Sequence, residues 1–515
     1  MDNSRINNQK NLNVNLNKFM NTTSIRTISS YKFINLLHLA KNGDYQALHH
    51  KICQYMFDLA EKEKELWIRI DEQEDVITPE NTENYFENRD GEKKYYRVSM
   101  ITKTMLDYDR MMLNLILEEN AENIIRENRY ASNMYRPYFF NFLIDISETD
   151  RKYIEFLINP ENVNQWFVGT FNYSGREEGR IFPGYIERIA SPAVYKDHKI
   201  CITDKRLSPA TLKAINDVYD LGPNPCTTDT DVNKELDEVL EKPEFKEIKI
   251  YNVGNGNCIY LKGRNSFGGL RVLYDIGYYC TIPAQNVKNK IYRPIAQAIR
   301  HLKPHCVILS HWDSDHFYGC AYAGMDIFRC RWFAPNLDGK STISAKRVAK
   351  YLQVLKNLIL VNRSSGRRIA GVQGMVSSLE LFMGEKKKGK DKKITDHNKE
   401  GLILSLVNEK WEYIRSLMLG DVPYESIPTG IMFAGNTPYD YLIVPHHGAE
   451  MDTGLLSSAT GKRDGYAIIC AKPKRPNAVH KKALEKNGYI TMTTGDAGRC
   501  IDINLSRKGF PRKRP

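Results

Sequence analysis

A short run of histidines and aspartates sets the tightest constraint on what this chain can fold into. His311, Asp313, Asp315 and His316 lie within six residues, directly after the apolar run 306–309. Such a run is typical of a buried strand, and a turn at its end can direct alternate side chains into one cleft. Imidazole and carboxylate groups are good ligands for Zn²⁺ and Mn²⁺. The alternative is a polar loop whose acids cap the helix that follows.

Two further apolar runs end in side chains of the same kind. Asp421 follows the run 417–419 after one glycine, and the pair His446 and His447 follows the run 442–444 after one proline. Taken alone, Asp421 is equally consistent with a helix cap, and the histidine pair with a hydrogen-bonded surface loop. Three strand ends that carry ligand-type residues predict a centre for two metal ions that activate water.

The order of these motifs resembles that of the metallo-β-lactamase superfamily, whose signature is H-x-H-x-D-H. The sequence S-H-W-D-S-D-H at 310–316 is most similar to the H-x-D-x-D-H variant of ComEC-type competence hydrolases and their free-standing relatives. The resemblance covers most of 245–508, and these further motifs carry it: V-G-N-G-N-C at 253–258, L-Y-D-I-G at 273–277, L-G-D at 419–421, V-P-H-H-G at 444–448, N-A-V-H at 477–480 and T-G-D-A-G at 494–498. It implies an αββα sandwich and a metal-dependent hydrolase.

The resemblance also implies which residues bind the metal ions. His311 and Asp313 would face one ion. Asp315 and His316 would face the other, and Asp421 would bridge the two. His311 and Asp315 are the two residues that we expect to be catalytic.

Further roles follow from the same resemblance. Either His446 or His447 would complete the second metal site, with His446 slightly favoured. The nucleophile would be a metal-activated hydroxide, which Asp315 would orient and relieve of its proton. Asp313 replaces a histidine of the wider superfamily, and this harder ligand favours Mn²⁺ over Zn²⁺. Asp275 is similar to the family's buried acid that supports the metal-binding loops.

Four residues near these motifs each keep two open interpretations. His397 is the only histidine between the first motif and Asp421, and it is either a metal ligand or a simple loop residue. Tyr318 either hydrogen-bonds a phosphate or packs. His480 either contacts the substrate or makes a structural hydrogen bond. Trp312 either stacks on a base or is buried under its own loop.

Composition excludes several classes of protein. Of the 515 residues, 42% are hydrophobic and 26% are charged, which excludes wholesale disorder. The apolar runs are too short to cross a bilayer, so we expect no association with a membrane. The ten cysteines are scattered without a C-x-x-C pair, which argues against a zinc ribbon or a disulfide framework. We therefore expect a cytoplasmic protein.

The charge of the chain is divided between its two halves. Residues 1–240 carry 30 Lys+Arg against 38 Asp+Glu, so residues 241–515 carry a net charge of +20. A basic half of this kind predicts a polyanionic partner, most specifically DNA, and the alternative is a solvated basic face. We expect the following side chains to bind nucleic acid: Lys386, Lys387, Lys388, Lys390, Arg367, Arg368, Lys474 and Arg475.

Three segments are expected along the chain. Residues 1–30 form a flexible Asn-rich leader, and residues 31–240 form a mainly helical α+β region that regulates the protein or binds a protein partner or a second copy. Helical spacing is expected through residue 129, followed by short strands and helices. Residues 245–515 form the α/β hydrolase domain with basic loops and a basic tail, and its first strands are expected at 248–253, 257–262 and 269–274.

The combined expectation is a metal-dependent phosphodiesterase with two divalent ions, most specifically a DNA nuclease. A bacterial defence effector is one interpretation of its biological role. Two alternatives remain open: a hydrolase of a small phosphodiester such as a cyclic nucleotide, and a protein that binds nucleic acid or a partner without turnover.

Overall fold

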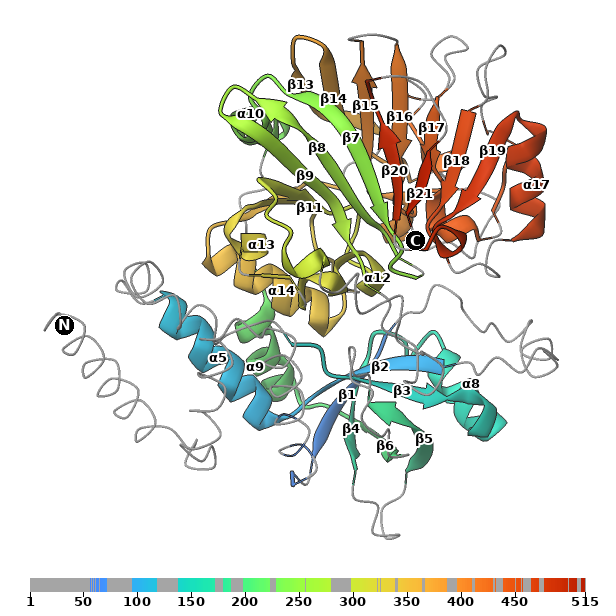
Figure 1. The fold of residues 1–515 in the computed structure, drawn as a ribbon. Helices are drawn as coiled ribbons and strands as arrows, with labels where there is room; N and C mark the ends of the chain where they lie inside the picture. The colour runs from blue at the N-terminus through green and yellow to red at the C-terminus, as the bar shows by residue number, and fades with distance from the viewer. Residues whose placement is uncertain are drawn as a thin grey trace, which may run out of the picture.

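The computed structural model describes residues 56–514 with gaps and shows a mixed α/β protein, as predicted (Figure 1). The longest internal gaps cover residues 72–94, 118–137, 187–197 and 279–297. The described residues form two parts, a closed barrel of six strands within 66–206 and two larger sheets within 244–514. The leader expected at 1–30 lies outside the described residues.

The N-terminal part is built on a closed barrel with the strand order β1-β2-β3-β5-β6-β4, in which all neighbours pair antiparallel. Its strands are β1 (Leu66–Ile70), β2 (Tyr95–Ile101), β3 (Asn141–Asp145), β4 (Trp166–Thr170), β5 (Arg180–Ile186) and β6 (His198–Arg206). Its helices are α5 (Lys103–Leu117), α8 (Arg151–Ile158) and α9 (Pro209–Tyr219).

The barrel corrects the expectation of helical structure through residue 129. Helix α5 agrees with that expectation, whereas β1 and β2 contradict it. All five residues of β1 are buried, so the strand shows none of the alternation between polar and apolar residues that reveals a half-exposed strand. The N-terminal part is α+β, as expected, but its centre is a barrel of strands.

The C-terminal part contains two sheets, one of eight strands in the order β12-β11-β10-β9-β8-β7-β20-β21 and one of seven in the order β13 to β19. The first sheet contains β7 (Glu244–Tyr251), β8 (Cys258–Asn265), β9 (Gly268–Ile276), β10 (Cys306–Ile308), β11 (Arg331–Pro335), β12 (Leu358–Val361), β20 (Cys500–Asn504) and β21 (Arg512–Arg514). The second contains β13 (Arg367–Gln373), β14 (Ser377–Met383), β15 (Leu402–Asn408), β16 (Ile414–Met418), β17 (Tyr441–Ile443), β18 (Gly465–Ile469) and β19 (Tyr489–Thr493).

Apolar side chains hold these two sheets together. Strand β14 alternates buried and half-buried positions along its seven residues, which is the pattern of a strand with one face in a core. Ile250 and Ile259 of the first sheet and Leu404 and Met418 of the second belong to one buried cluster. Helix α17 (Ala478–Lys486) packs on β19, and α10 (Asp229–Leu240) packs on β13. The two sheets therefore form a sandwich with helices packed against it.

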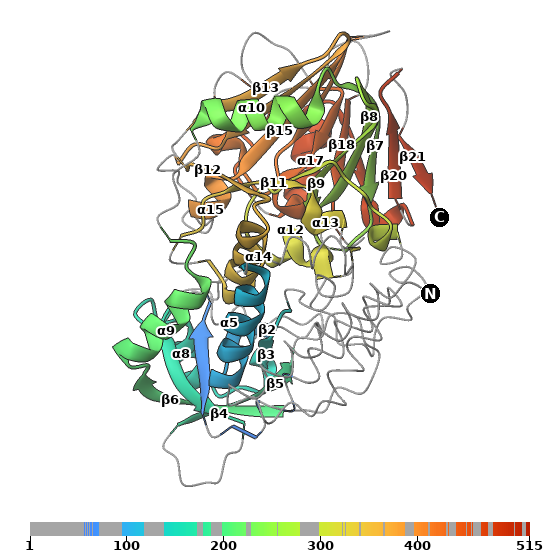
Figure 2. The same cartoon turned by 90° about the vertical axis from the view of Figure 1, so that its left-hand side faces the viewer.

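Short helices connect the sandwich with the barrel. Helices α12 (Ser314–Phe317), α13 (Asp326–Arg329) and α14 (Ile343–Val354) lie between the two parts, and α14 contacts α5 and α9 (Figure 2). Buried residues of the barrel and of these helices, such as Phe139 and Phe317, belong to one continuous apolar cluster. No helix in the described part of the chain has the length and apolarity that a membrane span requires.

Candidate metal centre

The first ligand motif lies in the turn between β10 and α12. The strand ends at Ile308, and Asp313 occupies the N-cap position of the helix. Its carboxylate makes no capping hydrogen bond, and Asp313 Oδ2 lies 3.2 Å from His311 Nε2 instead. The interpretation of this motif as a simple helix cap is therefore wrong.

The other two motifs lie at the carboxyl ends of neighbouring parallel strands, β16 and β17. Gly420 adopts a φ of +57° between β16 and Asp421, a backbone conformation that glycine adopts without strain. His446 and His447 have φ values of +49° and +53°, which is rare for residues with a side chain. This strained turn points both imidazoles toward Asp421.

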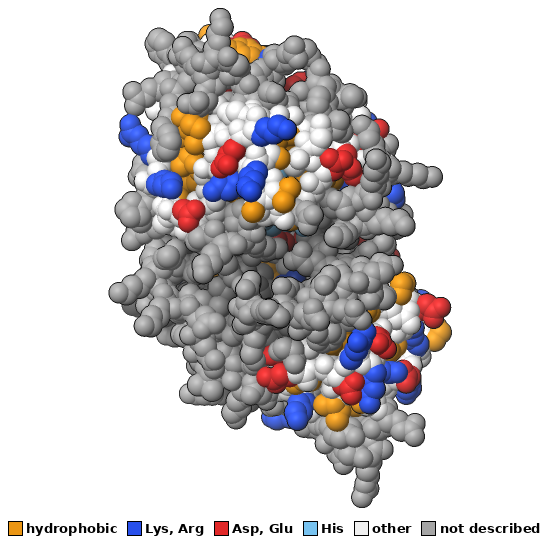
Figure 3. Space-filling model, turned by 90° about the vertical axis from the view of Figure 1, so that its right-hand side faces the viewer, with side chains coloured by type: hydrophobic (Ala, Val, Ile, Leu, Met, Phe, Trp, Pro, Cys, Tyr) orange, Lys and Arg blue, Asp and Glu red, His pale blue; other side chains and the backbone are white. Residues whose placement is uncertain are grey.

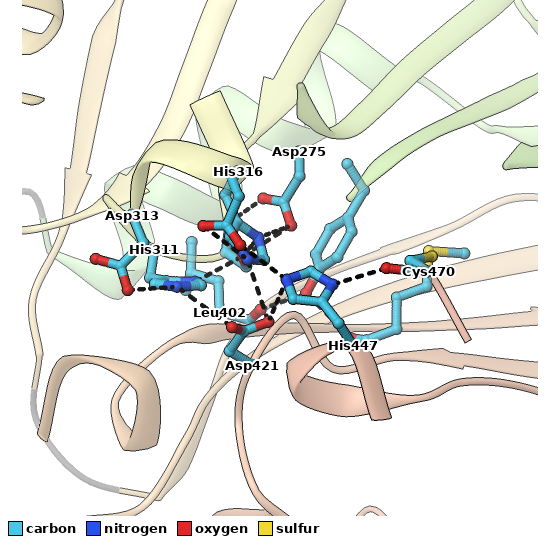
Figure 4. A network of polar contacts seen from close by, with 12 residues as sticks. Asp275, His311, Asp313, His316, Leu402, Asp421, His447 and Cys470 are labelled. Atoms are coloured by element: carbon cyan, nitrogen blue, oxygen red, sulfur yellow. Dashed lines mark hydrogen bonds and ion pairs between the residues drawn. The ribbon is translucent and has the colours of Figure 1, made fainter. Parts of the chain in front are cut away.

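The structure brings all seven predicted ligands together. Figure 4 labels five of them, which are His311, Asp313, His316, Asp421 and His447. Ligand-type atoms within 4.8 Å of one another form two overlapping groups: His311, His316 and Asp421, and Asp315, His316 and His447. His316 Nε2 lies 3.1 Å from Asp421 Oδ1, and His447 Nε2 lies 3.0 Å from Asp315 Oδ2. Asp421 also lies 3.1 Å from His446 Nδ1, so its carboxylate is central to the arrangement.

The grouping differs from the assignment that the resemblance implied. His447, and not the slightly favoured His446, joins Asp315 and His316. His316 also belongs to the group of His311, whereas the resemblance placed these two histidines at different ions. His311 and His316 are close neighbours in space, with ring centroids 4.0 Å apart.

A row of hydrogen bonds fixes the orientation of the histidines. Asp275 Oδ2 accepts a hydrogen bond from His316 Nδ1 at 2.8 Å, and the carbonyl oxygen of Cys470 accepts one from His447 Nδ1 at 3.0 Å. In the neutral form of each ring, these bonds place the proton on Nδ1 and leave a lone pair on Nε2. Those lone pairs face the carboxylates of Asp421 and Asp315. In this form each contact places a lone pair against a carboxylate, and a divalent cation bound to both groups would stabilise it.

The burial of the ligand-type atoms also supports a metal ion at this place. His311 Nε2, His316 Nε2 and both carboxylate oxygens of Asp421 are buried, and none of them forms a hydrogen bond with the described residues. A buried polar atom without a hydrogen bond costs free energy, and such atoms are rare away from functional sites. The donor set of imidazole nitrogens and carboxylate oxygens fits a divalent metal ion such as Zn²⁺ or Mn²⁺.

The pKa values of three residues in the centre are shifted by the charges of their neighbours. Burial by itself would lower the pKa of His316, but the carboxylates of Asp421, Asp275 and Asp315 outweigh it and raise that pKa well above its ordinary value. Burial would raise the pKa of Asp315, but His316 and His447 lower it to about 2. Burial also opposes ionisation of Asp421, yet the same two histidines hold its pKa well below the usual range. The centre therefore holds ionised carboxylates and attracts positive charge.

Ser310 is a member of the site to which the sequence motifs assigned no role. Its backbone N–H donates to Asp275 Oδ1 at 2.6 Å, and its hydroxyl donates to Asp275 Oδ2 at 2.8 Å. The same hydroxyl oxygen lies 3.0 Å from His311 Nδ1 and 3.1 Å from His316 Nδ1. Asp275 thus supports residues 310–316, named the metal loop from here on, as the resemblance implied. Ser310 links Asp275 to both histidines of this loop. The sequence feature that could have indicated this role is the position of Ser310 between the apolar run 306–309 and His311.

Glycine 277 allows the metal loop to approach β9. A Cβ atom at this position would lie 1.7 Å from the carbonyl oxygen of Asp315 and 2.7 Å from that of Asn257. Gly277→Ala should therefore displace the backbone of Asp315 and lower the affinity for divalent metal about tenfold or more, at a cost of about 1–3 kcal/mol in stability. Titration with Mn²⁺ or Zn²⁺ measures the first effect, and chemical denaturation measures the second.

Gly269→Ala is the matched control, because a Cβ atom at Gly269, on the strand that Gly277 follows, meets no atom within 4 Å. Equal metal affinity in the two variants would contradict the role assigned to Gly277.

Three residues with open interpretations have structural roles. Tyr318 is buried, stacks on Phe139 at 4.1 Å and accepts a hydrogen bond from Asn141 Nδ2, so it packs. Trp312 is buried and donates from Nε1 to the carbonyl oxygen of Pro335 at 2.7 Å, so it is not a base-stacking platform.

His480 is also structural. Its Nδ1 donates to the carbonyl oxygen of Ala449 at 2.8 Å, and its Nε2 lies 3.0 Å from the hydroxyl of Tyr424. Burial lowers the pKa of His480, which keeps the ring neutral. The backbone of His397 lies in the short helix α15 (Asp396–Lys399), and its side chain is outside the described ones.

The residues expected to bind nucleic acid are only partly described. Arg367 forms two hydrogen bonds with Asp229, and Arg368 pairs with Glu380 at 2.8 Å. Lys386 is exposed in the segment that follows β14. The other five expected residues lie outside the described ones: Lys387, Lys388, Lys390, Lys474 and Arg475. On the face that carries α17 and β19, basic side chains are interspersed with acidic and hydrophobic ones (Figure 3).

Comparison with known proteins leaves the assignment to a family open. No family model matches the chain, and no curated protein does. Among the solved structures that match is Zn²⁺-bound PqqB from Methylobacterium extorquens, with 10% sequence identity over 44% of this chain and 81% of that chain. Its TM-score of 0.23 is too low to assign a fold. Membership of the metallo-β-lactamase superfamily, and of its ComEC-type branch, stays a prediction.

Proposed function

We propose that this chain is a metal-dependent hydrolase. The observation that carries the proposal is the contact between the Nε2 atoms of His316 and His447 and the ionised carboxylates of Asp421 and Asp315. Hydrogen bonds at Nδ1 direct both Nε2 lone pairs into this contact, so divalent cations fit between the two sets of groups.

The side chains of this site would have different roles in binding the ions and in activating water. His311 and Asp421, with Asp313 beside them, would hold one ion, and Asp315 and His447 would hold a second, with His316 in reach of both. When bound, divalent ions lower the pKa of water toward neutrality and offset negative charge in the transition state. The side chain of Asp315 is 26% exposed, and it would orient the attacking water and take its proton.

The substrate that we propose is a phosphodiester, most specifically DNA, and the metal is Mn²⁺ or Zn²⁺. The net charge of +20 in residues 241–515 supports a polyanionic substrate. Because Arg367 and Arg368 are paired with acids, this part of the proposal depends on the lysine run that begins at the exposed Lys386.

Reloading metal-stripped protein with Mn²⁺ or Zn²⁺ should restore hydrolysis of linear or circular DNA and of a chromogenic phosphodiester. The double variant Asp315→Ala/His316→Ala, treated in the same way, should show neither metal uptake at the full stoichiometry nor turnover. Gel analysis of the DNA and absorbance of the released chromophore measure the two activities, and a metal assay of the protein measures the stoichiometry.

The arms of this experiment separate the possible outcomes. Turnover of the chromogenic phosphodiester without cleavage of DNA would replace DNA by a small phosphodiester as the substrate. Full metal occupancy with no turnover of any phosphodiester would contradict the phosphodiesterase. Failure of the wild-type chain to bind a divalent ion would contradict the metal-dependent hydrolase itself.

A further inference from the structure

One face of the barrel is polar although it is buried. Arg69 of β1 pairs across the sheet with Ser99 of β2, and Ser99 pairs with Asn141 of β3. All three side chains are at most 2% exposed. Because directly paired residues lie on the same face, these side chains form one polar row. Arg97, two residues before Ser99, lies on this face as well.

This face contacts the C-terminal part beside the metal ligands. Arg97 Nη1 donates to Ser314 Oγ at 2.8 Å, and Ser314 is the residue between Asp313 and Asp315. Asn141 Nδ2 donates to the hydroxyl of Tyr318 at 2.6 Å, two residues beyond the ligand at position 316. Barrel residues thus hold the loop that carries four candidate ligands at its middle and just beyond its C-terminal end.

Apolar contacts and charge reinforce these two hydrogen bonds. Phe139, just before β3, stacks on Tyr318 and meets Phe317 edge to face, with ring centroids 4.1 and 5.7 Å apart. The guanidinium of Arg97 lies 5.8 Å from the centre of the Tyr318 ring. Arg97 also places a positive charge beside Ser314, between the two aspartates of this loop.

The geometry points to Arg97 as a positioning residue of the metal centre. We infer that its hydrogen bond to Ser314 fixes the backbone between Asp313 and Asp315, so that both carboxylates point toward the ions. Ligand groups bind metal tightly only when neighbouring groups fix their orientation, and loss of such support typically lowers affinity 10–100-fold. The barrel is therefore part of the metal centre. The inference rests on the proposed metal-dependent function.

A double-mutant cycle in the full-length chain isolates the hydrogen bond. Arg97→Ala and Ser314→Ala should each weaken binding of Mn²⁺ or Zn²⁺ by about tenfold, and the double variant should be no weaker than either single variant. Arg97→Lys, which keeps the charge and a donor, should recover part of the affinity. The measurement is calorimetric titration of the metal-stripped protein with each metal chloride, together with the melting temperature of each variant.

Arg151→Ala is the matched control, because Arg151 is an exposed arginine of the same part of the chain, on α8. It should bind metal as the wild-type chain does. Wild-type affinity in Arg97→Ala, or effects of Arg97→Ala and Ser314→Ala that simply add, would overturn the inference while leaving the proposed function intact. A wild-type chain that binds no divalent ion would overturn the proposed function and the inference together. Ser314→Ala removes only one hydroxyl, so it tests the bond even if Arg97→Ala fails to fold.

Discussion

Replacing Asp421 by asparagine should remove metal from the centre and lower the hydrolytic rate about a thousandfold or more. The carboxylate is fully buried, and it contacts His311, His316, His446 and His447 at 3.1–4.0 Å. Asparagine keeps the shape but removes the negative charge and one acceptor oxygen. The histidine lone pairs would then lack the anion that completes a divalent site, and metal stoichiometry and turnover should fall together.

The matched control for this prediction is Asp440→Asn. Asp440 is another buried aspartate, directly before β17, and its Oδ2 accepts a hydrogen bond from the backbone N–H of Arg415 at 2.9 Å. It lies outside the ligand groups, so its variant should keep its metal and its turnover. Normal turnover in Asp421→Asn at full metal occupancy would contradict the central place of that carboxylate.

Replacing Asp109 by asparagine should lower the free energy of unfolding by about 3–5 kcal/mol, because it leaves a buried arginine without its counter-ion. Asp109 lies on α5 and Arg347 on α14, and Arg347 Nε lies 2.9 Å from Asp109 Oδ2. Both side chains are at most 1% exposed. Urea denaturation followed by tryptophan fluorescence measures the change.

Two tyrosines complete the surroundings of this ion pair. Tyr219 and Tyr138 donate hydrogen bonds from their hydroxyl groups to Asp109 Oδ2, and the guanidinium of Arg347 lies 4.0 Å from the centre of the Tyr138 ring. Burial raises the pKa of both phenols well above the ordinary value, so both stay protonated donors. Asparagine at position 109 would leave these donors with a weaker acceptor.

Asp107→Asn is the control, since Asp107 is on the same helix and forms a partly exposed ion pair with Arg110 at 3.4 Å. Its loss should cost less than about 1 kcal/mol. Equal stability of the two variants would show that the buried pair does not connect the barrel with the C-terminal part.

The clustering of the candidate metal ligands was predictable because its signal in the sequence is local. Four of them lie within six residues after an apolar run, and each of the other motifs follows an apolar run of its own. The expected strands at 248–253, 257–262 and 269–274 all lie mainly within β7, β8 and β9, since their turns are marked by glycine. The choice between His446 and His447 depended on side-chain direction in a strained turn, which residue spacing does not encode.

The barrel was missed because its signal is not local. Trp67 of β1 pairs with Val168 of β4, far along the chain, and β1 is buried on both faces. A strand of this kind has the same apolar pattern as a segment of buried helix. Tyr318 and Trp312 likewise become structural residues only through partners in distant segments, Asn141 and Pro335.

The continuous apolar cluster between barrel and sandwich limits how this protein can be divided. Phe317, Phe328 and Tyr351 on the connecting helices belong to the same cluster as Phe139 and Phe142 of the barrel. A fragment that kept only the sandwich would expose these aromatic rings to water and would tend to aggregate. The two parts should therefore unfold together, and exchange of either part for a foreign domain would disrupt their shared core.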